Sequence, residues 1–178
     1  QIFTLLESVS PRVHMASIDE AYVDITGSLR LFGGEDALAA LLKRRIREET
    51  GLPCTVAVAS NKLVSKVAAN EAKPDGYLSI PAGGEAAWLA PLPVGKLPGI
   101  GPRTRGTLES MGILTIGALA AARAGDVPTV LRVALSGPGA QVFSARSGEA
   151  ASFLRVLAED MEGLHLDRVL VRAGHVPD

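Results

Sequence analysis

The sequence predicts an α+β fold, in which part of a mixed or antiparallel sheet carries helices and a small all-helical region with a helix-hairpin-helix follows. Short β-branched segments alternate with helix-period segments in the first half, whereas the second half shows helical spacing and short loops. The chain has 178 residues, 47% of them hydrophobic, and one cysteine. It is therefore long enough to bury a core without disulfides, and a reducing cytoplasmic setting is expected.

The first half opens with a helix and two strands. Apolar residues at helical spacing begin at Ile2, and Pro11 ends that helix. Alternating and β-branched residues predict two short strands over 13–17 and 21–26. Residues 18–20 lie between these strands or at their junction.

Helix and strand then alternate to the end of the first half. Apolar residues three and four apart predict a helix over 35–50, which Gly51 closes. A run of small and β-branched residues predicts a strand over 54–59, and either Ser60 or Asn61 caps the next helix. The remaining expected elements are that helix to about residue 72, a turn over 73–76 and a short strand over 77–80.

Charge divides the chain into three segments. Residues 1–90 carry nine basic and eleven acidic side chains, residues 91–148 six and two, and residues 149–178 three and six. A prolyl pair at 91 and 93 marks the boundary between a domain over 1–90 and a basic domain over 91–148, and 149–178 stays unassigned. Gln1 is not an initiator residue, so we expect a piece of a longer protein. No apolar run approaches the ~20 residues that span a membrane.

Two adjacent carboxylates, Asp19 and Glu20, follow the first strand. Like charges side by side are costly unless a cation neutralises them, and Mg²⁺ prefers carboxylate oxygens together with substrate phosphates. One hypothesis is therefore a metal site for phosphoryl transfer. The other is an exposed hairpin turn with two solvated acids.

Three lysines fall within an arc of about 40° on the helix that follows the 54–59 strand, when each residue turns by 100°. They are Lys62, Lys66 and Lys73, the last at the helix exit before a proline. This stripe is either an anion-binding edge or the ordinary solvated face of an amphipathic helix.

The segment Leu97-Pro98-Gly99-Ile100-Gly101-Pro102 predicts a tight hairpin between two helices. Pro102 suits the first position of the second helix. Arg103, Thr104 and Arg105 follow at its N-terminus, where backbone amides and basic side chains favour a phosphodiester backbone. The alternative is a plain αα-hairpin.

The remaining candidates are weaker. The basic run 43–45 with Arg47 leads into Glu48 and Glu49, which favours a solvated helix face with local ion pairs. The three histidines show no metal-ligand spacing, and Cys54 is expected in the core. Aromatic content of 4% argues against a base-stacking platform for single strands.

Taken together and in this order, the motifs resemble the Y-family of translesion DNA polymerases, most closely its bacterial DNA polymerase IV (DinB-like) branch. The resemblance covers about residues 1–148. The matching segments are Ser17-Ile18-Asp19-Glu20-Ala21-Tyr22-Val23-Asp24, Leu31-Phe32-Gly33, Ser60-Asn61-Lys62-Leu63-Val64-Ser65-Lys66, Lys73-Pro74-Asp75-Gly76, Leu97-Pro98-Gly99-Ile100-Gly101 and Thr115-Ile116-Gly117.

This resemblance implies that residues 1–90 are the later part of a catalytic palm and residues 91–148 a DNA-binding thumb. It makes Asp19 and Glu20 the ligands of two Mg²⁺ ions, and Lys73, with Lys66, a contact of the incoming dNTP triphosphate. The hairpin residues 99–105 would hold primer-template DNA. The chemistry implied is error-prone, lesion-bypass DNA synthesis in the intact protein, with a sliding clamp bound through regions outside this chain.

The family's first metal-binding aspartate is expected upstream of Gln1, so these residues alone should catalyse little. Arg105 also stands where the family usually has a small residue. The alternative function is therefore a non-catalytic, polymerase-derived DNA-binding or adaptor protein in DNA damage tolerance. A structural helical-hairpin domain without a ligand is a third, more remote reading.

Overall fold

The computed structural model describes residues 1–122, 131–133, 143–145 and 168–173. The chain forms two compact units, one of residues 1–82 with 165–178 and the other of residues 83–164. In the described part of the chain, none of the helices combines the length and apolar character needed to span a membrane.

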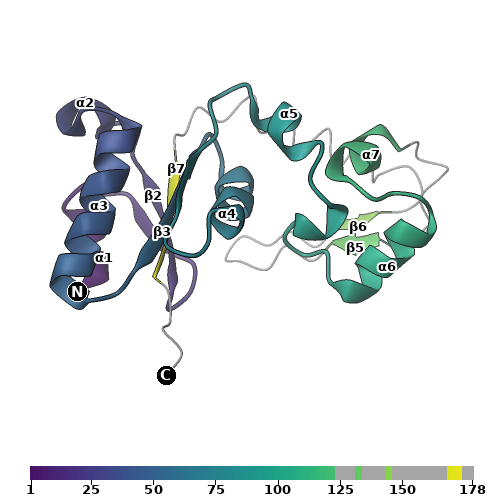
Figure 1. Cartoon of the computed structure of the whole chain (residues 1–178), viewed down its shortest axis with the longest axis horizontal. Coiled ribbons are helices and arrows are strands. Elements are labelled where there is room, and N and C mark those ends of the chain that lie inside the picture. The colour runs from purple at the N-terminus through teal and green to yellow at the C-terminus, as the bar shows by residue number, and fades with distance from the viewer. Residues whose placement is uncertain (123–130, 134–142, 146–167, 174–178) are drawn as a thin grey trace. The chain divides into compact units, whose positions relative to one another are not determined.

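The first unit is built on a five-stranded sheet in the order β1-β2-β7-β3-β4 (Figure 1). Its strands are β1 (Val13–Met15), β2 (Glu20–Asp24), β3 (Cys54–Ala59), β4 (Tyr77–Ser79) and β7 (Arg168–Ala173). Strand β7 is antiparallel to both of its neighbours, and only β3 and β4 run parallel. The expected mixed sheet is thereby confirmed.

Helices cover both faces of this sheet (Figure 1). On one face, α1 (Ile2–Glu7) and α3 (Glu35–Thr50) enclose the main core with α2 (Leu29–Phe32) beside them. Alternate residues of β3 join that core, namely Cys54, Val56 and Val58. Helix α4 (Lys62–Glu71) packs on the other face through its buried Val64, Val67 and Ala68.

Most boundaries of the first unit follow the sequence. Helix α3 occupies the expected range, and Gly51 closes it with a left-handed φ of 74°. Asn61 is the cap of α4, since its side chain accepts a hydrogen bond from the Val64 amide at 2.9 Å. Two elements, α2 and the C-terminal β7, were not predicted from the sequence, and β7 lies in the unassigned segment 149–178.

The second unit contains α5 (Glu85–Leu89), the 3-10 helix η1 (Val94–Lys96), α6 (Pro102–Ser110) and α7 (Ile116–Ala121). It also contains an antiparallel pair, β5 (Leu131–Val133) with β6 (Phe143–Ala145). The expectation that residues 91–148 are helical throughout was therefore wrong on this point, because backbone pairing there joins segments ten residues apart. The buried apolar residues of its described part are Leu89, Val94, Leu97, Ile100, Leu108, Ile113, Ile116 and Leu119.

Candidate functional site

The Asp19-Glu20 pair lies at a tight turn between two strands. The Ala16 amide donates to the Glu20 carbonyl at 2.8 Å, which closes the loop between β1 and β2. At its tip, Ile18 is fully exposed, and Ser17 Oγ donates to Asp19 Oδ1 at 2.6 Å. The alternative of a hairpin turn is therefore correct for the backbone. Asp19 lies in this turn, where the Ser17 hydroxyl holds its carboxylate.

Glu20 is not a solvated acid. The residue is only 8% exposed, and its carboxylate forms an ion pair with Lys66 of α4. The two side chains are 11% and 25% exposed, respectively. A carboxylate at this depth needs a compensating charge, and Lys66 supplies it across 46 residues of sequence.

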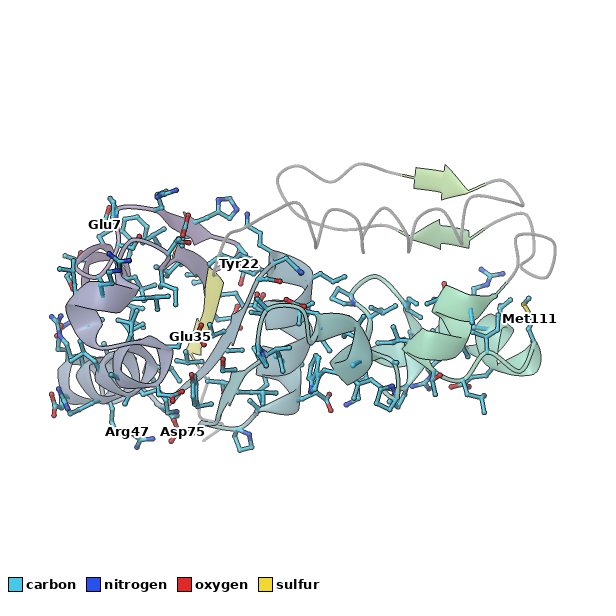
Figure 2. All side chains as sticks on the ribbon, turned by 90° about the horizontal axis from the view of Figure 1, so that it is seen from above. Glu7, Tyr22, Glu35, Arg47, Asp75 and Met111 are labelled. Atoms are coloured by element: carbon cyan, nitrogen blue, oxygen red, sulfur yellow. The ribbon has the colours of Figure 1, made fainter. Side chains whose placement is uncertain are left out.

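Lys62 makes the neighbouring contact, one helical turn before Lys66. Its Nζ lies 5.2 Å from the centre of the Tyr22 ring, two residues along β2 from Glu20. Figure 2 shows Tyr22 on the sheet close to helix α4. Burial raises the pKa of the Tyr22 hydroxyl, and the negative charge of Glu20 raises it further. Two of the three predicted lysines therefore contact β2, the strand that begins at Glu20.

The third lysine, Lys73, lies beyond the end of α4. Its Nζ donates to Asn70 Oδ1 at 2.9 Å, and this bond is exposed. The turn that follows is strongly anchored, since Lys43 Nζ lies 2.7 Å from Asp75 Oδ1 and Arg47 Nη2 lies 2.5 Å from Asp75 Oδ2. Figure 2 shows Arg47 and Asp75 close together at one edge of the unit.

These contacts revise the reading of the basic run on α3. Arg44 and Arg45 do form the expected local pairs with Glu48 and Glu49. Lys43 and Arg47 instead hold a turn about 30 residues away. Residue spacing along α3 carries no signal for a partner so distant in sequence, so this contact could not be predicted from the sequence.

The donor chemistry at the acid pair suits a hard divalent cation. Asp19 and Glu20 offer carboxylate oxygens, the ligand type that Mg²⁺ prefers. Within the described residues, no group of three or more His, Cys, Asp or Glu side chains is arranged to hold a metal. The two carboxylates thus fit part of a magnesium site, which other oxygens would complete.

The predicted hairpin is present in the second unit, between η1 and α6. Gly99 has a φ of 89°, a backbone conformation that favours glycine, and Ile100 is buried behind it. Gly101 is the N-cap of α6, with no side-chain cap, and Pro102 takes the first helical position. The amides of this helix start are therefore presented without a competing side chain.

The two arginines of the hairpin differ. Arg103 is exposed, whereas the Arg105 side chain lies across Gly95, where an added Cβ would come within 2.6 Å of Arg105 Cδ. Arg105 Nε also lies 3.5 Å from Glu109 Oε1. Gly95 thus leaves room for a large residue at position 105, and its charge is partly offset by Glu109.

The fold is found in solved structures of other proteins. Solved structures with this fold include "Crystal Structure of a DinB Family Error Prone DNA Polymerase from Sulfolobus solfataricus", with a TM-score of 0.66, 18% identity, 98% of this chain covered and 76% of that chain. Another is "Insertion ternary complex of Dbh DNA polymerase", with a TM-score of 0.65, 18% identity and coverage of 98% and 74%. The chain therefore shares the fold of these two solved structures.

Sequence comparisons define the family. Residues 1–70 match the impB/mucB/samB family, and residues 83–113 match the IMS family HHH motif. A DNA polymerase IV of Methanoculleus marisnigri is 47% identical over 120 residues, covering 67% of this chain and 33% of the relative. One of Dehalococcoides mccartyi is 38% identical over 144 residues, covering 81% and 36%. The chain belongs to the DinB-like branch of the Y-family and spans about a third of these relatives' length.

Proposed function

We propose that the intact protein containing this chain is an error-prone, lesion-bypass DNA polymerase that adds dNTPs to a primer 3′ end. The observation that carries the proposal is a buried carboxylate beside a second one at a strand junction, facing a helix that presents lysines. Acids at turns are normally solvated, so a buried carboxylate such as Glu20 directly after a second acid is typical of a site prepared for cations. Membership of the Y-family supports the same reaction.

In this proposal, Asp19 and Glu20 hold Mg²⁺ through their carboxylate oxygens. Bound Mg²⁺ would supply charge stabilisation for the entering and leaving oxygens of phosphoryl transfer, with two ions in the intact enzyme. Ser17 keeps Asp19 oriented through its hydroxyl. Lys73 contacts the triphosphate of the incoming nucleotide. Lys43 and Arg47 anchor the turn that follows Lys73 through their ion pairs with Asp75, and this turn fixes the position of the Lys73 backbone.

The hairpin is the proposed grip on primer-template DNA. Gly99, Ile100 and Gly101 shape the turn, and the amides of α6 with Arg103 and Thr104 meet a phosphate without reading sequence. Arg105 adds charge at the same helix start. The six basic and two acidic residues of segment 91–148 support this placement of DNA. Work in the cytoplasm and a sliding clamp bound through other regions belong to the same proposal.

Primer extension by the intact protein tests this function. The Asp19→Ala variant should lose nucleotide incorporation. The control variant Asp36→Ala, which removes an acidic side chain from α3, should retain it. Unchanged incorporation by Asp19→Ala refutes the proposal.

The second candidate function is a non-catalytic DNA-binding or adaptor protein. The observation in its favour is that Lys66 already neutralises Glu20 and that the described residues form no three-ligand cluster. Such a protein would bind duplex DNA with strong salt dependence and without divalent metal. Fluorescence anisotropy in EDTA at low salt tests it, because loss of binding on chelation contradicts the adaptor.

A further inference from the structure

The ion pair between Lys66 and Glu20 is sheltered from solvent compared with the pairs of α3. The side chains are 25% and 11% exposed, whereas a surface pair such as Arg44 with Glu48 is 64% exposed on both sides. The pair of Lys43 with Asp75 is 23% and 40% exposed. Electrostatic interactions strengthen as water is excluded, so the attraction between the Lys66 and Glu20 charges is stronger than that within the exposed pairs.

The position of Lys66 is built into the packing of α4. Two strand residues on one face are about 6.6 Å apart, and four helical residues rise about 6 Å. Lys62 and Lys66 therefore match Tyr22 and Glu20 in register along the same strand. Asn61 caps the start of the helix, so the lysine pair is fixed against β2.

From this geometry we infer that Lys66 is a placeholder cation for the metal at Glu20. In the metal-free protein, its ammonium compensates the buried carboxylate and keeps it aimed beside Asp19. A metal that binds Glu20 takes over this compensation, and the ammonium is released toward the polyphosphate of a nucleotide. Lys66 is thus a positioning residue that links metal binding to nucleotide binding. The inference rests on the proposed function, because it needs Glu20 to be a metal ligand.

If the metal and the Lys66 ammonium compete for Glu20, removal of Lys66 should raise the affinity for the metal. Without Lys66, the metal no longer displaces a bound cation, so Mn²⁺, used as a probe for Mg²⁺, should bind Lys66→Met about fivefold more tightly, which corresponds to about 1 kcal/mol. Lys66→Arg keeps the charge and should stay near the unsubstituted affinity.

Lys62→Met is the matched control, because it removes the same charge from the same helix one turn away. Any general effect of losing a lysine near the carboxylates appears in this variant as well. A gain in Mn²⁺ affinity that is clearly larger for Lys66→Met than for Lys62→Met supports the placeholder. Equal gains, or weaker binding by Lys66→Met, overturn it.

Two further measurements on the whole chain complete the test. Glu20→Gln should lose Mn²⁺ binding; retained binding refutes the proposed metal site itself, and the placeholder with it. Adding Mg²⁺ to the unsubstituted chain should shift the NMR signal of the Lys66 ammonium more than that of Lys62, a readout that holds even if Lys66→Met fails to fold. An unshifted Lys66 signal alongside Mg²⁺ binding that Glu20→Gln abolishes overturns the placeholder and leaves the proposed function standing.

Discussion

Replacement of Lys43 by methionine should destabilise the first unit more than any other single change in the basic run of α3. The Lys43 ammonium donates to the Cys54 carbonyl at 2.6 Å, to the Asp75 carbonyl at 2.7 Å and to Asp75 Oδ1 at 2.7 Å. It therefore joins α3 to the start of β3 and to the turn before β4. Methionine keeps most of the length of the side chain and removes these three bonds together with a longer one to the Gly76 carbonyl at 3.4 Å.

The magnitude follows from these bonds and their exposure. A hydrogen bond to a charged group contributes about 1.5–3 kcal/mol to stability. The Lys43 side chain is 23% exposed and that of Asp75 40%, so water replaces part of the loss at the turn. We expect Lys43→Met to lower the free energy of unfolding by about 2 kcal/mol. Arg47→Met, whose side chain is 55% exposed, should cost less than about 1 kcal/mol.

Urea denaturation followed by far-UV circular dichroism measures both variants against the unsubstituted chain. The ratio of the two losses is the critical quantity, because both residues pair with the same carboxylate. Equal small losses for Lys43→Met and Arg47→Met would show that the Lys43 bonds to backbone carbonyls contribute little and would refute the reasoning.

The pH dependence of the same variants is a second readout. The hydrogen bond from Lys43, with the charges of Lys43 and Arg47, holds the pKa of Asp75 below its usual range. The stabilisation that the charged Asp75 carboxylate gains from these partners is therefore fully present above about pH 4, near the pKa of Asp75 in the unfolded chain. It is lost as the pH falls through the lower pKa of Asp75 in the folded chain. The stability gap between the unsubstituted chain and Lys43→Met should narrow on acidification below about pH 4. A gap independent of pH contradicts this coupling.

Three further predictions concern packing, reactivity and DNA. Gly76→Ala should cost about 3 kcal/mol in urea unfolding, because its Cβ would lie 1.8 Å from the Ala72 carbonyl oxygen; Gly27→Ala, with open space around it, should stay within about 1 kcal/mol, and equal effects would contradict the clash. Burial raises the pKa of the Cys54 thiol to about 11, so a thiol reagent at pH 8 should label it only after unfolding, and prompt labelling of the folded chain would be the opposite result. Arg103→Glu should weaken duplex binding in anisotropy titrations more than Arg105→Glu, with a salt slope reduced by about 0.9 per lost phosphate contact; the reverse order would count against the assigned roles.

Local sequence signals predicted the elements that depend on neighbouring residues. The range of α3 follows from apolar spacing and Gly51, the start of α4 from Asn61, and the hairpin from Gly99 and Pro102. Each of these signals acts within a few residues of the feature it specifies. They were sufficient to locate the acid pair, the lysine helix and the hairpin in one chain.

Contacts between distant segments could not be predicted in this way. The pairing of Glu20 with Lys66 spans 46 residues, and that of Lys43 with Asp75 spans 32. Strand β7 lies between β2 and β3, although the sequence between residues 149 and 178 resembled nothing in the family. Such pairings depend on which strands become neighbours, a choice that tertiary packing makes and local propensity does not.

A crystal structure of the intact protein with primer-template DNA, a dNTP and Ca²⁺ in place of Mg²⁺ tests the central claim most directly. We predict metal within about 2.3–2.6 Å of carboxylate oxygens of both Asp19 and Glu20. The Lys66 ammonium should have left Glu20, and a DNA phosphate should lie at the start of α6. A metal bound elsewhere, with Glu20 still paired to Lys66, would contradict the account.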